Sequence, residues 1–318
     1  MNISELAESI IGGKRLNRSD DLTVLTGADT DELCSAADRI RKALCGDSAD
    51  LCSIINGRSG RCPENCKFCA QSAHNSTGID EYGFLDENTI LAECRHNAER
   101  GVHRFSIVTA GRTLSDVDFE KAVSAYRRMS AECGIKLCAS HGLLTEEQFT
   151  RLRESGVTTY HCNIETSRRY FPSICTTHTF DDKIACIKRA QKCGLSVCSG
   201  GIIGMGETWE DRVDMALTLS ELSIHSVPIN ALRPIKGTAL EDAVPLTETD
   251  ILRTAAIFRF ILPEAYIRLA AGRIIMEYSG ERAFRSGANA AITGDMLTTS
   301  GNDIKTDMEM LTKLGYKV

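Results

Sequence analysis

Short apolar runs alternate along this chain with longer segments in which apolar residues recur every three or four positions. The runs are four to seven residues long and rich in branched or aromatic side chains, which favours β-strands. We predict eight strands, the last of them weak, at 51–56, 105–108, 136–139, 158–164, 196–200, 226–230, 266–269 and 290–293.

The segments between and after the runs carry the period of amphipathic helices. They are 88–100, 116–133, 145–155, 181–193, 209–222, 247–262 and 303–314. Capping residues such as Ser115, Thr145 and Thr247 support the helix starts, and Gly134, Gly156 and Gly194 support the ends.

Alternating strands and helices indicate a parallel sheet with crossover helices, and eight such units close as a barrel. We therefore predict an α/β fold, a single TIM-type (β/α)8 barrel, over residues 48–318. Residues 1–47 show helical periodicity without motif chemistry and are predicted to form a helical cap on the amino-terminal side of the barrel.

Composition narrows the function. The net charge is −6 and no long basic run occurs, which argues against nucleic acid as a partner. No apolar run approaches twenty residues, so no membrane span is expected. Fourteen cysteines without a signal peptide indicate a reducing, cytoplasmic location rather than a disulfide framework. A small-molecule substrate is the expectation.

Cys62, Cys66 and Cys69 stand at Cys-x3-Cys-x2-Cys spacing in a short polar segment after the first predicted strand. Three thiolates can hold a cubic [4Fe–4S] cluster and leave its fourth iron without a protein ligand, whereas four-cysteine ferredoxin sets close the cluster. A structural zinc site would require a fourth ligand in paired spacing. The motif therefore predicts a cluster with one open iron.

Polar residues also interrupt several predicted strands near their carboxyl ends, where barrel enzymes place their chemistry. They are Cys138, His161, Asn163, Cys198, Asn230 and Arg268. We expect them to converge on one cavity.

The cysteine motif resembles that of radical S-adenosylmethionine (radical SAM) enzymes, and further segments resemble the biotin synthase family within them. The segments are the cysteine motif with Gln71-Ser72, 163–166, 198–208, 227–230, 268–273, 287–289 and 297–299. The resemblance runs from about Cys52 to Thr299.

The resemblance implies conversion of dethiobiotin to biotin by radical chemistry. In the family, a [4Fe–4S] cluster cleaves S-adenosylmethionine to a 5′-deoxyadenosyl radical, and an auxiliary iron–sulfur cluster donates sulfur. It also implies an external electron donor of the flavodoxin or ferredoxin type, and a homodimer.

Residue roles follow from the resemblance alone. Cys62, Cys66 and Cys69 would bind the [4Fe–4S] cluster. The implied cofactor-binding residues are Phe68, Asn163, Glu165, Gly201, Ile202, Ile203 and Gly204. Glu165 replaces the aspartate of better-known members. Asn163 and Asn230 would bind the ureido ring of the substrate, and Thr298 and Thr299 its carboxylate tail. The alternative for both asparagines is a strand-end amide that caps a loop.

The auxiliary cluster is where the chain departs from the family. Cys138, Cys198 and Arg268 match three of the expected ligands, but Ser106 stands where the fourth ligand, a cysteine, is expected. The resemblance also implies that Arg268, Asn163 and Asn230 are catalytic residues. A hydroxyl is a harder ligand than a thiolate and is rarely ionised.

We consider Cys162, Cys52 and Cys175, in that order, as replacements for the missing thiol. The cluster is then either [2Fe–2S] or a four-iron cluster with an extra sulfide. Arg268 has the alternative of a salt-bridged barrel arginine.

Three other functions remain open. One is another radical SAM enzyme of similar barrel, of the hydrogenase-maturation or methylornithine synthase type. A non-catalytic iron–sulfur redox protein is the second. A degenerate paralogue that lost sulfur insertion together with the thiol at position 106 is the third.

Overall fold

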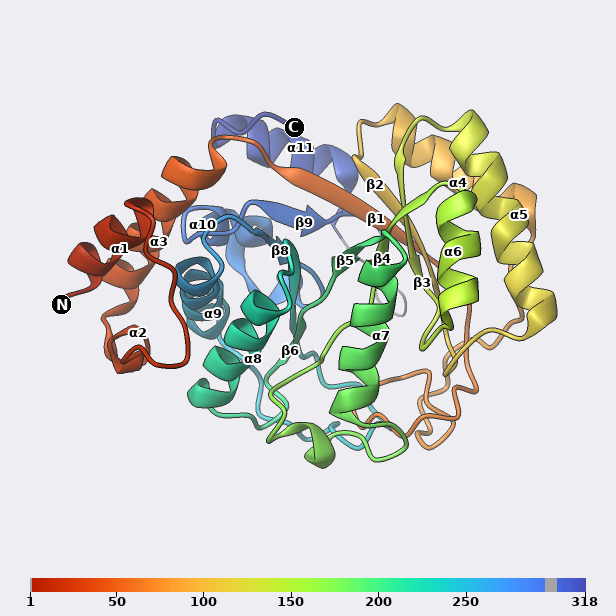
Figure 1. The fold of residues 1–318 in the computed structure, drawn as a ribbon, viewed down its shortest axis with the longest axis horizontal. Helices are drawn as coiled ribbons and strands as arrows, with labels where there is room; N and C mark the ends of the chain where they lie inside the picture. The colour runs from red at the N-terminus through yellow and green to blue at the C-terminus, as the bar shows by residue number, and fades with distance from the viewer. Residues whose placement is uncertain (1, 295–301) are drawn as a thin grey trace.

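The computed structural model describes residues 2–294 and 302–318 and forms a closed barrel of parallel strands (Figure 1). The strands are β1 (Asp50–Arg58), β2 (Arg104–Thr109), β3 (Lys136–Ser140), β4 (Val157–His161), β5 (Ser196–Cys198), β6 (Gly201–Ile203), β7 (Ser226–Ala231), β8 (Tyr266–Leu269) and β9 (Ala290–Ile292). β5 pairs with β4 on one side and β7 on the other, which closes the ring. β5 and β6 share one place beside β7, so the predicted eight-stranded barrel is confirmed.

Helices surround the barrel. They are α4 (Glu87–Glu99), α5 (Asp116–Glu132), α6 (Glu146–Glu154), α7 (Phe180–Lys192), α8 (Trp209–Glu221), α9 (Glu248–Ile261) and α11 (Ile304–Lys313). Ser115, Thr145 and Thr247 are N-caps, as predicted, because their hydroxyls accept backbone N–H groups of the first turn. Each predicted helix therefore exists within a few residues of its expected bounds.

Two predicted boundaries were wrong. The run 196–200 is divided, because β5 ends at Cys198 and β6 begins at Gly201. Between them Gly200 packs closely on β7, where a Cβ would lie 1.9 Å from the carbonyl oxygen of Pro228. The run 158–164 ends as a strand at His161, and its last residues form a loop.

The strand–helix alternation is also interrupted between β8 and β9. Short elements replace a long crossover helix there: η2 (Arg273–Ile275), η3 (Glu277–Gly280) and α10 (Glu281–Phe284). A further short 3-10 helix, η1 (Phe171–Ser173), follows β4.

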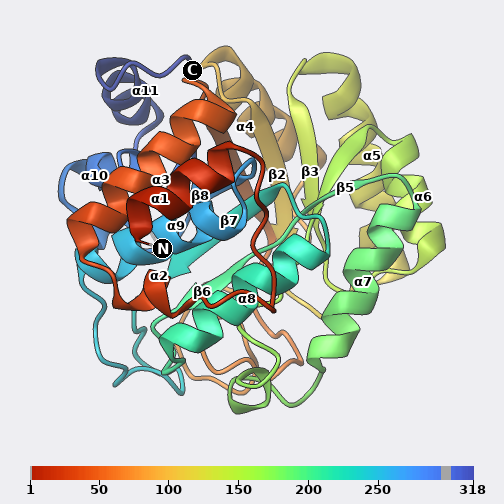
Figure 2. The ribbon, with the colours of Figure 1, turned by 60° about the vertical axis from the view of Figure 1, so that its left-hand side comes forward.

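The amino-terminal segment is helical, with α1 (Ile3–Ile11), α2 (Thr23–Gly27) and α3 (Thr30–Cys45). Figure 2 shows these helices gathered beside α9. Arg253 of α9 fastens them, because its guanidinium donates to the carbonyl oxygens of Thr26 and Ala28, each at 2.8 Å. That residues 1–47 form a unit separate from a barrel at 48–318 stays a prediction.

The hydrophobic core lies between the strands and the outer helices. Large side chains such as Phe105, Phe149, Tyr160 and Phe258 are fully buried there. Within the described residues, no helix is long and apolar enough to cross a membrane. The inside of the barrel is different, because polar and sulfur-bearing side chains face it and leave a cavity.

Candidate active site

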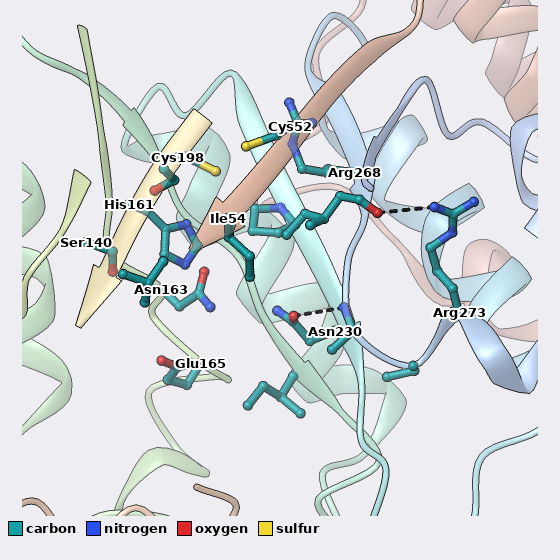
Figure 3. A pocket seen from close by; sticks show the side chains of 18 of the residues that line it. Cys52, Ile54, Ser140, His161, Asn163, Glu165, Cys198, Asn230, Arg268 and Arg273 are labelled. Carbon is teal, nitrogen blue, oxygen red and sulfur yellow. Dashed lines mark hydrogen bonds between the residues drawn. The ribbon is translucent and has the colours of Figure 1, made fainter. Parts of the chain in front are cut away.

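A cavity of about 450 Å³ occupies the barrel interior (Figure 3). Alternate residues of the strands face it, as the two-residue period of a strand requires. Those that bear on function are Cys52, Arg104, Ser106, Cys138, His161, Asn163, Cys198, Asn230 and Arg268. Enclosed sites for small organic ligands have volumes of about 300–1,000 Å³. The polar residues near the strand ends therefore line one cavity, as expected.

The loop after β1 carries Cys62, Cys66 and Cys69. The amide of Asn75 fixes it by donating to the carbonyl oxygens of Cys69 at 2.8 Å and Cys66 at 3.4 Å. Cys69 and its neighbour Phe68 line the cavity. A cubane spreads its three cysteine ligands over three irons, and a loop with this spacing at the cavity edge fits that arrangement.

Deeper in the barrel lies an inner thiol group, which consists of Cys52, Cys138 and Cys198. The thiols of Cys52 and Cys138 are neighbours whose pKa values influence each other, and the hydroxyl of Ser226 donates to the sulfur of Cys198 at 3.3 Å. Figure 3 shows the sulfur atoms of Cys52 and Cys198 facing the same space beside Arg268.

Positive charge surrounds the inner thiol group. Arg104 donates to both carboxylate oxygens of Asp50 at 3.0 Å, and the guanidinium of Arg268 pairs with the same carboxylate. The neighbouring thiol of Cys52, followed by the charges of Arg104 and Arg268, lowers the pKa of Cys138 to about 7 although burial opposes this. Cations beside thiols favour the thiolate that binds iron.

Arg268 forms a salt bridge with Asp50 in the barrel wall, which was the alternative to its role as a ligand of the auxiliary cluster. Its Nη1 also donates to the carbonyl oxygens of Asp50 and Ala291, each at 3.0 Å. The side chain is therefore held by the barrel wall while it borders the cavity.

Ser106 lies beside Cys138 in the register of β2 and β3. Its buried hydroxyl oxygen has no hydrogen-bond partner among the described residues, although it faces the cavity. A buried polar atom without a partner is costly unless a bound group satisfies it. Three thiols, two guanidinium groups and this hydroxyl fit a site for an iron–sulfur cluster.

The structure does not bring Cys162 to the inner thiol group, and our first choice for the missing ligand was therefore misplaced. β4 ends at His161, and Cys162 is buried in the hydrophobic core with Cys186 of α7 rather than on the cavity wall. Cys175 is also elsewhere, with its sulfur 3.7 Å from that of Cys66 in the cluster loop. Only Cys52, the second choice, lines the cavity.

Glu165 stands where the chain turns from β4 toward α7. It adopts a left-handed conformation, with φ 69°, and its carbonyl oxygen accepts the N–H of Ile202 at 2.8 Å. One carboxylate oxygen is buried with no hydrogen-bond partner in the described part of the chain, as expected of an acceptor that awaits a hydroxyl group.

The glycine-rich segment packs closely against Glu165. A Cβ on Gly201 would lie 2.3 Å from the carbonyl oxygen of Glu165, so only glycine fits there. Ile202 lines the cavity, whereas the side chain of Ile203 is fully buried in the core, and Gly204 donates its N–H to Glu207 at 2.8 Å. Of the two isoleucines, only Ile202 can contact a ligand in the cavity through its side chain.

Both asparagines face the cavity and also anchor loops. The amide oxygen of Asn163 accepts the N–H of Gly200 at 3.0 Å. Asn230 donates to the carbonyl oxygen of Gly201 at 3.1 Å and accepts the N–H of Ala271 at 3.2 Å. Each amide keeps further hydrogen-bonding capacity, so the two roles are compatible. Thr298 and Thr299 lie outside the described residues.

Sequence reasoning missed two residues near the site, Lys183 and His178. Nζ of Lys183 on α7 lies 3.8 Å from a carboxylate oxygen of Glu165. Burial lowers the pKa of this lysine, but Cys162, Glu165 and Cys66 raise it more, so the amine stays charged. The buried His178 hydrogen-bonds to Glu64 of the cluster motif. Both lie over a hundred positions from that motif, and no local sequence signal connects them to it.

Comparisons with known proteins agree with this geometry. Residues 58–219 match the family model "Radical SAM superfamily", and residues 228–317 match "Biotin and Thiamin Synthesis associated domain".

The chain is 64% identical over 316 residues to a biotin synthase of Alkaliphilus metalliredigens, with 99% of each chain covered. It is 61% identical over 316 residues to a biotin synthase of Clostridium beijerinckii, with 99% of this chain and 100% of that one covered.

Among solved structures, methylornithine synthase matches with a TM-score of 0.84 at 21% identity, covering 98% of this chain and 96% of that one. The hydrogenase maturase HydG matches with a TM-score of 0.82 at 17% identity, covering 99% of this chain and 74% of that one. These likenesses concern the fold alone.

The fold is therefore shared with methylornithine synthase and the hydrogenase maturase, whereas the relatives with high sequence identity are biotin synthases. The chain belongs to the biotin synthase family of radical SAM enzymes.

Proposed function

We propose that this protein converts dethiobiotin to biotin by inserting sulfur between two carbon atoms of the substrate. The observation that carries the proposal is the arrangement of two separate cysteine sets on one cavity. The cluster loop borders the cavity, and the inner thiol group lies within the barrel wall. A substrate between them would have a radical source on one side and a sulfur source on the other.

Each cysteine set has a distinct role in this proposal. Cys62, Cys66 and Cys69 hold the [4Fe–4S] cluster, and Cys52, Cys138 and Cys198 hold the auxiliary cluster, of [2Fe–2S] or four-iron type. When bound, the first supplies an electron that cleaves S-adenosylmethionine, and the second supplies sulfur.

The protein's own residues bind and orient the two organic molecules. Glu165 accepts hydrogen bonds from the ribose hydroxyls of S-adenosylmethionine, and Gly201 lets the backbone approach it closely. Phe68 and Ile202 contribute apolar surface to its binding site. Lys183 carries positive charge near the cluster loop and Glu165, where a carboxylate of the cofactor would be favoured.

For the substrate, Asn163 and Asn230 hydrogen-bond the ureido ring, and the enclosing barrel excludes water from the reacting carbons. Arg268 and Arg104 balance the charge of the inner thiolates. Thr298 and Thr299 remain candidates for the substrate's carboxylate. A flavodoxin- or ferredoxin-type donor and a homodimeric state complete the proposal.

Anaerobic incubation of the reconstituted protein with dethiobiotin, S-adenosylmethionine and a reductant tests it. We expect biotin and 5′-deoxyadenosine, both detected by mass spectrometry. A non-catalytic redox protein would form neither product. A paralogue without sulfur insertion would form 5′-deoxyadenosine but no biotin.

A further inference from the structure

A second possible metal site adjoins the cluster loop on the side away from the cavity. Residues 174–178, after η1, are fastened to the cysteine motif by Asn65, whose amide oxygen accepts the N–H groups of Thr176 at 2.9 Å and Thr177 at 3.2 Å. The N–H of Lys67 donates to the carbonyl oxygen of Ile174 at 2.9 Å. This attachment brings Cys175 and His178 against Cys66.

Cys66, Cys175 and His178 bring two sulfur atoms and a ring nitrogen close together. The sulfur atoms of Cys66 and Cys175 are 3.7 Å apart. The sulfur of Cys175 lies 3.4 Å from Nδ1 and 3.9 Å from Nε2 of His178. One ligand atom from each residue lies within 4.8 Å of the other two.

These separations match the edges of a tetrahedral zinc site. With zinc–sulfur bonds of about 2.3 Å and zinc–nitrogen bonds of about 2.0 Å, tetrahedral angles place two sulfurs about 3.8 Å apart and a sulfur and a nitrogen about 3.5 Å apart. The sulfur–sulfur distance of 3.7 Å and the 3.9 Å between the sulfur of Cys175 and Nε2 of His178 lie within a few tenths of an ångström of these values. The third pair, Cys66 and His178, is within 4.8 Å, so closing the site requires these two side chains to approach each other.

The surroundings of His178 resemble the support that metal-binding histidines receive. Nδ1 hydrogen-bonds to a carboxylate oxygen of Glu64 at 2.5 Å, which leaves Nε2 with its lone pair free for an ion. Glu64 is held in turn by Thr177 at 2.5 Å and by Arg112 at 3.2 Å. The ring also packs edge-on against Phe171.

Access differs among the three residues. Cys175 and His178 are buried, whereas Cys66 is only half-buried, so an ion can enter beside Cys66. Cys175 and His178 do not border the cavity, and the proposed reaction uses neither of them.

We propose that Cys66, Cys175 and His178 bind one zinc-type divalent ion when the [4Fe–4S] cluster is absent. The two thiols release their protons to solvent on binding, His178 binds through Nε2 while Nδ1–H donates to Glu64, and water completes the tetrahedron. The inference rests on the proposed function only in that Cys66 is also a cluster ligand.

Sharing Cys66 has a direct consequence. One thiolate cannot serve a tetrahedral zinc ion and a cluster iron in their usual geometries at once, so the ion and the cluster exclude each other. The bound ion fixes the empty cluster loop to residues 174–178 and must leave before the cluster is built.

The test uses the metal-free, reduced full-length protein with Co²⁺ as a spectroscopic probe for zinc. We expect thiolate-to-cobalt charge-transfer absorption and the visible bands of tetrahedral Co²⁺ in the wild type and in Cys62→Ser. In Cys175→Ser and His178→Ala we expect one equivalent less of bound ion. The inner thiol group is present in all four proteins, so the differences report on this site.

Cys62→Ser is the matched control because it removes a cluster ligand but not a ligand of the proposed site. Equal loss in Cys62→Ser, or no loss in Cys175→Ser and His178→Ala, would overturn the proposal. Glu64→Gln should weaken binding by about tenfold to a hundredfold through its support of His178.

Two further measurements test the site, and the first needs only the wild-type protein. X-ray absorption of zinc added to one equivalent should find two sulfurs and one imidazole nitrogen, and three sulfurs without nitrogen would contradict the proposal. Zinc should slow cluster reconstitution, followed by absorbance, in the wild type more than in Cys175→Ser. Equal slowing would place the ion on the cluster cysteines alone.

Failure here leaves the proposed function intact, because that function is measured on the cluster-loaded protein as biotin formation. Failure of biotin formation leaves the zinc site intact, because that site is measured without the cluster.

Discussion

At the scale of single residues, the thiol that we propose as the third ligand of the auxiliary cluster lies on the strand next to that of Ser106. Ser106 pairs in register with Ile54, and Cys52 precedes Ile54 by two positions, so both face the barrel interior. Cys52 therefore offers a thiol on the cavity wall near Cys138, although position 106 carries a serine.

Cys52→Ala should remove auxiliary-cluster iron and abolish biotin formation, because the inner thiol group then falls to two members. Cofactor cleavage should persist, since Cys62, Cys66 and Cys69 are untouched. Iron and sulfide analysis, with quantification of 5′-deoxyadenosine and biotin, checks both expectations.

Cys162→Ala is the matched control, because it also removes one buried cysteine from the barrel, but one that lies in the hydrophobic core. It should keep the auxiliary iron, because its thiol contacts Cys186 rather than the cavity. The ligand assignment fails if Cys162→Ala loses that iron and Cys52→Ala retains it.

His141 gives a prediction on pH. Its fully buried ring lies 3.0 Å from the hydroxyl of Thr109 and 3.1 Å from that of Tyr126, and burial lowers its pKa from 6.5 to about 3. The unfolded chain binds the proton first as pH falls, so stability is complete above pH 6.5 and declines toward pH 3. The slope is about 1.4 kcal/mol per pH unit.

Urea unfolding at pH 7 and pH 5 should therefore show a loss from this group of about 2 kcal/mol in the wild type. His141→Gln should lack this part of the loss. If the free energies of unfolding of the two proteins change in parallel with pH, the ring is not held neutral by burial.

At the scale of elements, periodicity was enough to locate the strands and the helices, because each strand of this barrel packs apolar residues against an outer helix. It could not find the break between β5 and β6. At that break the backbone of Gly200 lies close to the carbonyl of Pro228, which is distant in sequence, so the contact exists only in the folded barrel.

Gly200→Ala should destabilise this junction, because a Cβ 1.9 Å from a backbone oxygen forces β5 or β7 to move. We expect a loss of about 1–3 kcal/mol in the free energy of unfolding and weaker binding of S-adenosylmethionine. Thermal unfolding and equilibrium binding measure the two effects.

Gly83→Ala is the control, since a Cβ there meets nothing within 4 Å. It should change neither the melting temperature nor cofactor affinity appreciably. Comparable losses in both variants would show that the Gly200 junction is not special.

At the scale of the whole molecule, the sequence was enough to predict which strand-end side chains share one cavity, whereas their roles stay predictions. Strand-end positions such as Cys138 and Asn230 converge on the cavity because parallel strands end at one face. Cys162 was ranked above Cys52 because its strand lies between those of Cys138 and Cys198. Residues reached only through loop packing, such as His178, gave no local signal.

Because S-adenosylmethionine and dethiobiotin are both expected to bind inside the barrel, they should stabilise the entire fold. A ligand that binds only the folded state at a hundred times its dissociation constant adds about 2.7 kcal/mol. The reconstituted protein should melt at higher temperature with S-adenosylmethionine and dethiobiotin present.

Cys69→Ser, which removes the cluster ligand that borders the cavity, should respond much less to S-adenosylmethionine in the same thermal assay. An equal rise in melting temperature in this variant would mean that the cofactor binds without the cluster.

Strand β1 connects the two cysteine sets, because Cys52 lies near its start and the cluster loop follows its end at Arg58. Extended chain advances about 3.3 Å per residue, so β1 sets a span of roughly 20 Å between these points. An insertion of one residue between Cys52 and Arg58 would reverse the alternation of inward and outward side chains along β1, so either Cys52 or the residues beside the cluster loop would turn away from the barrel interior.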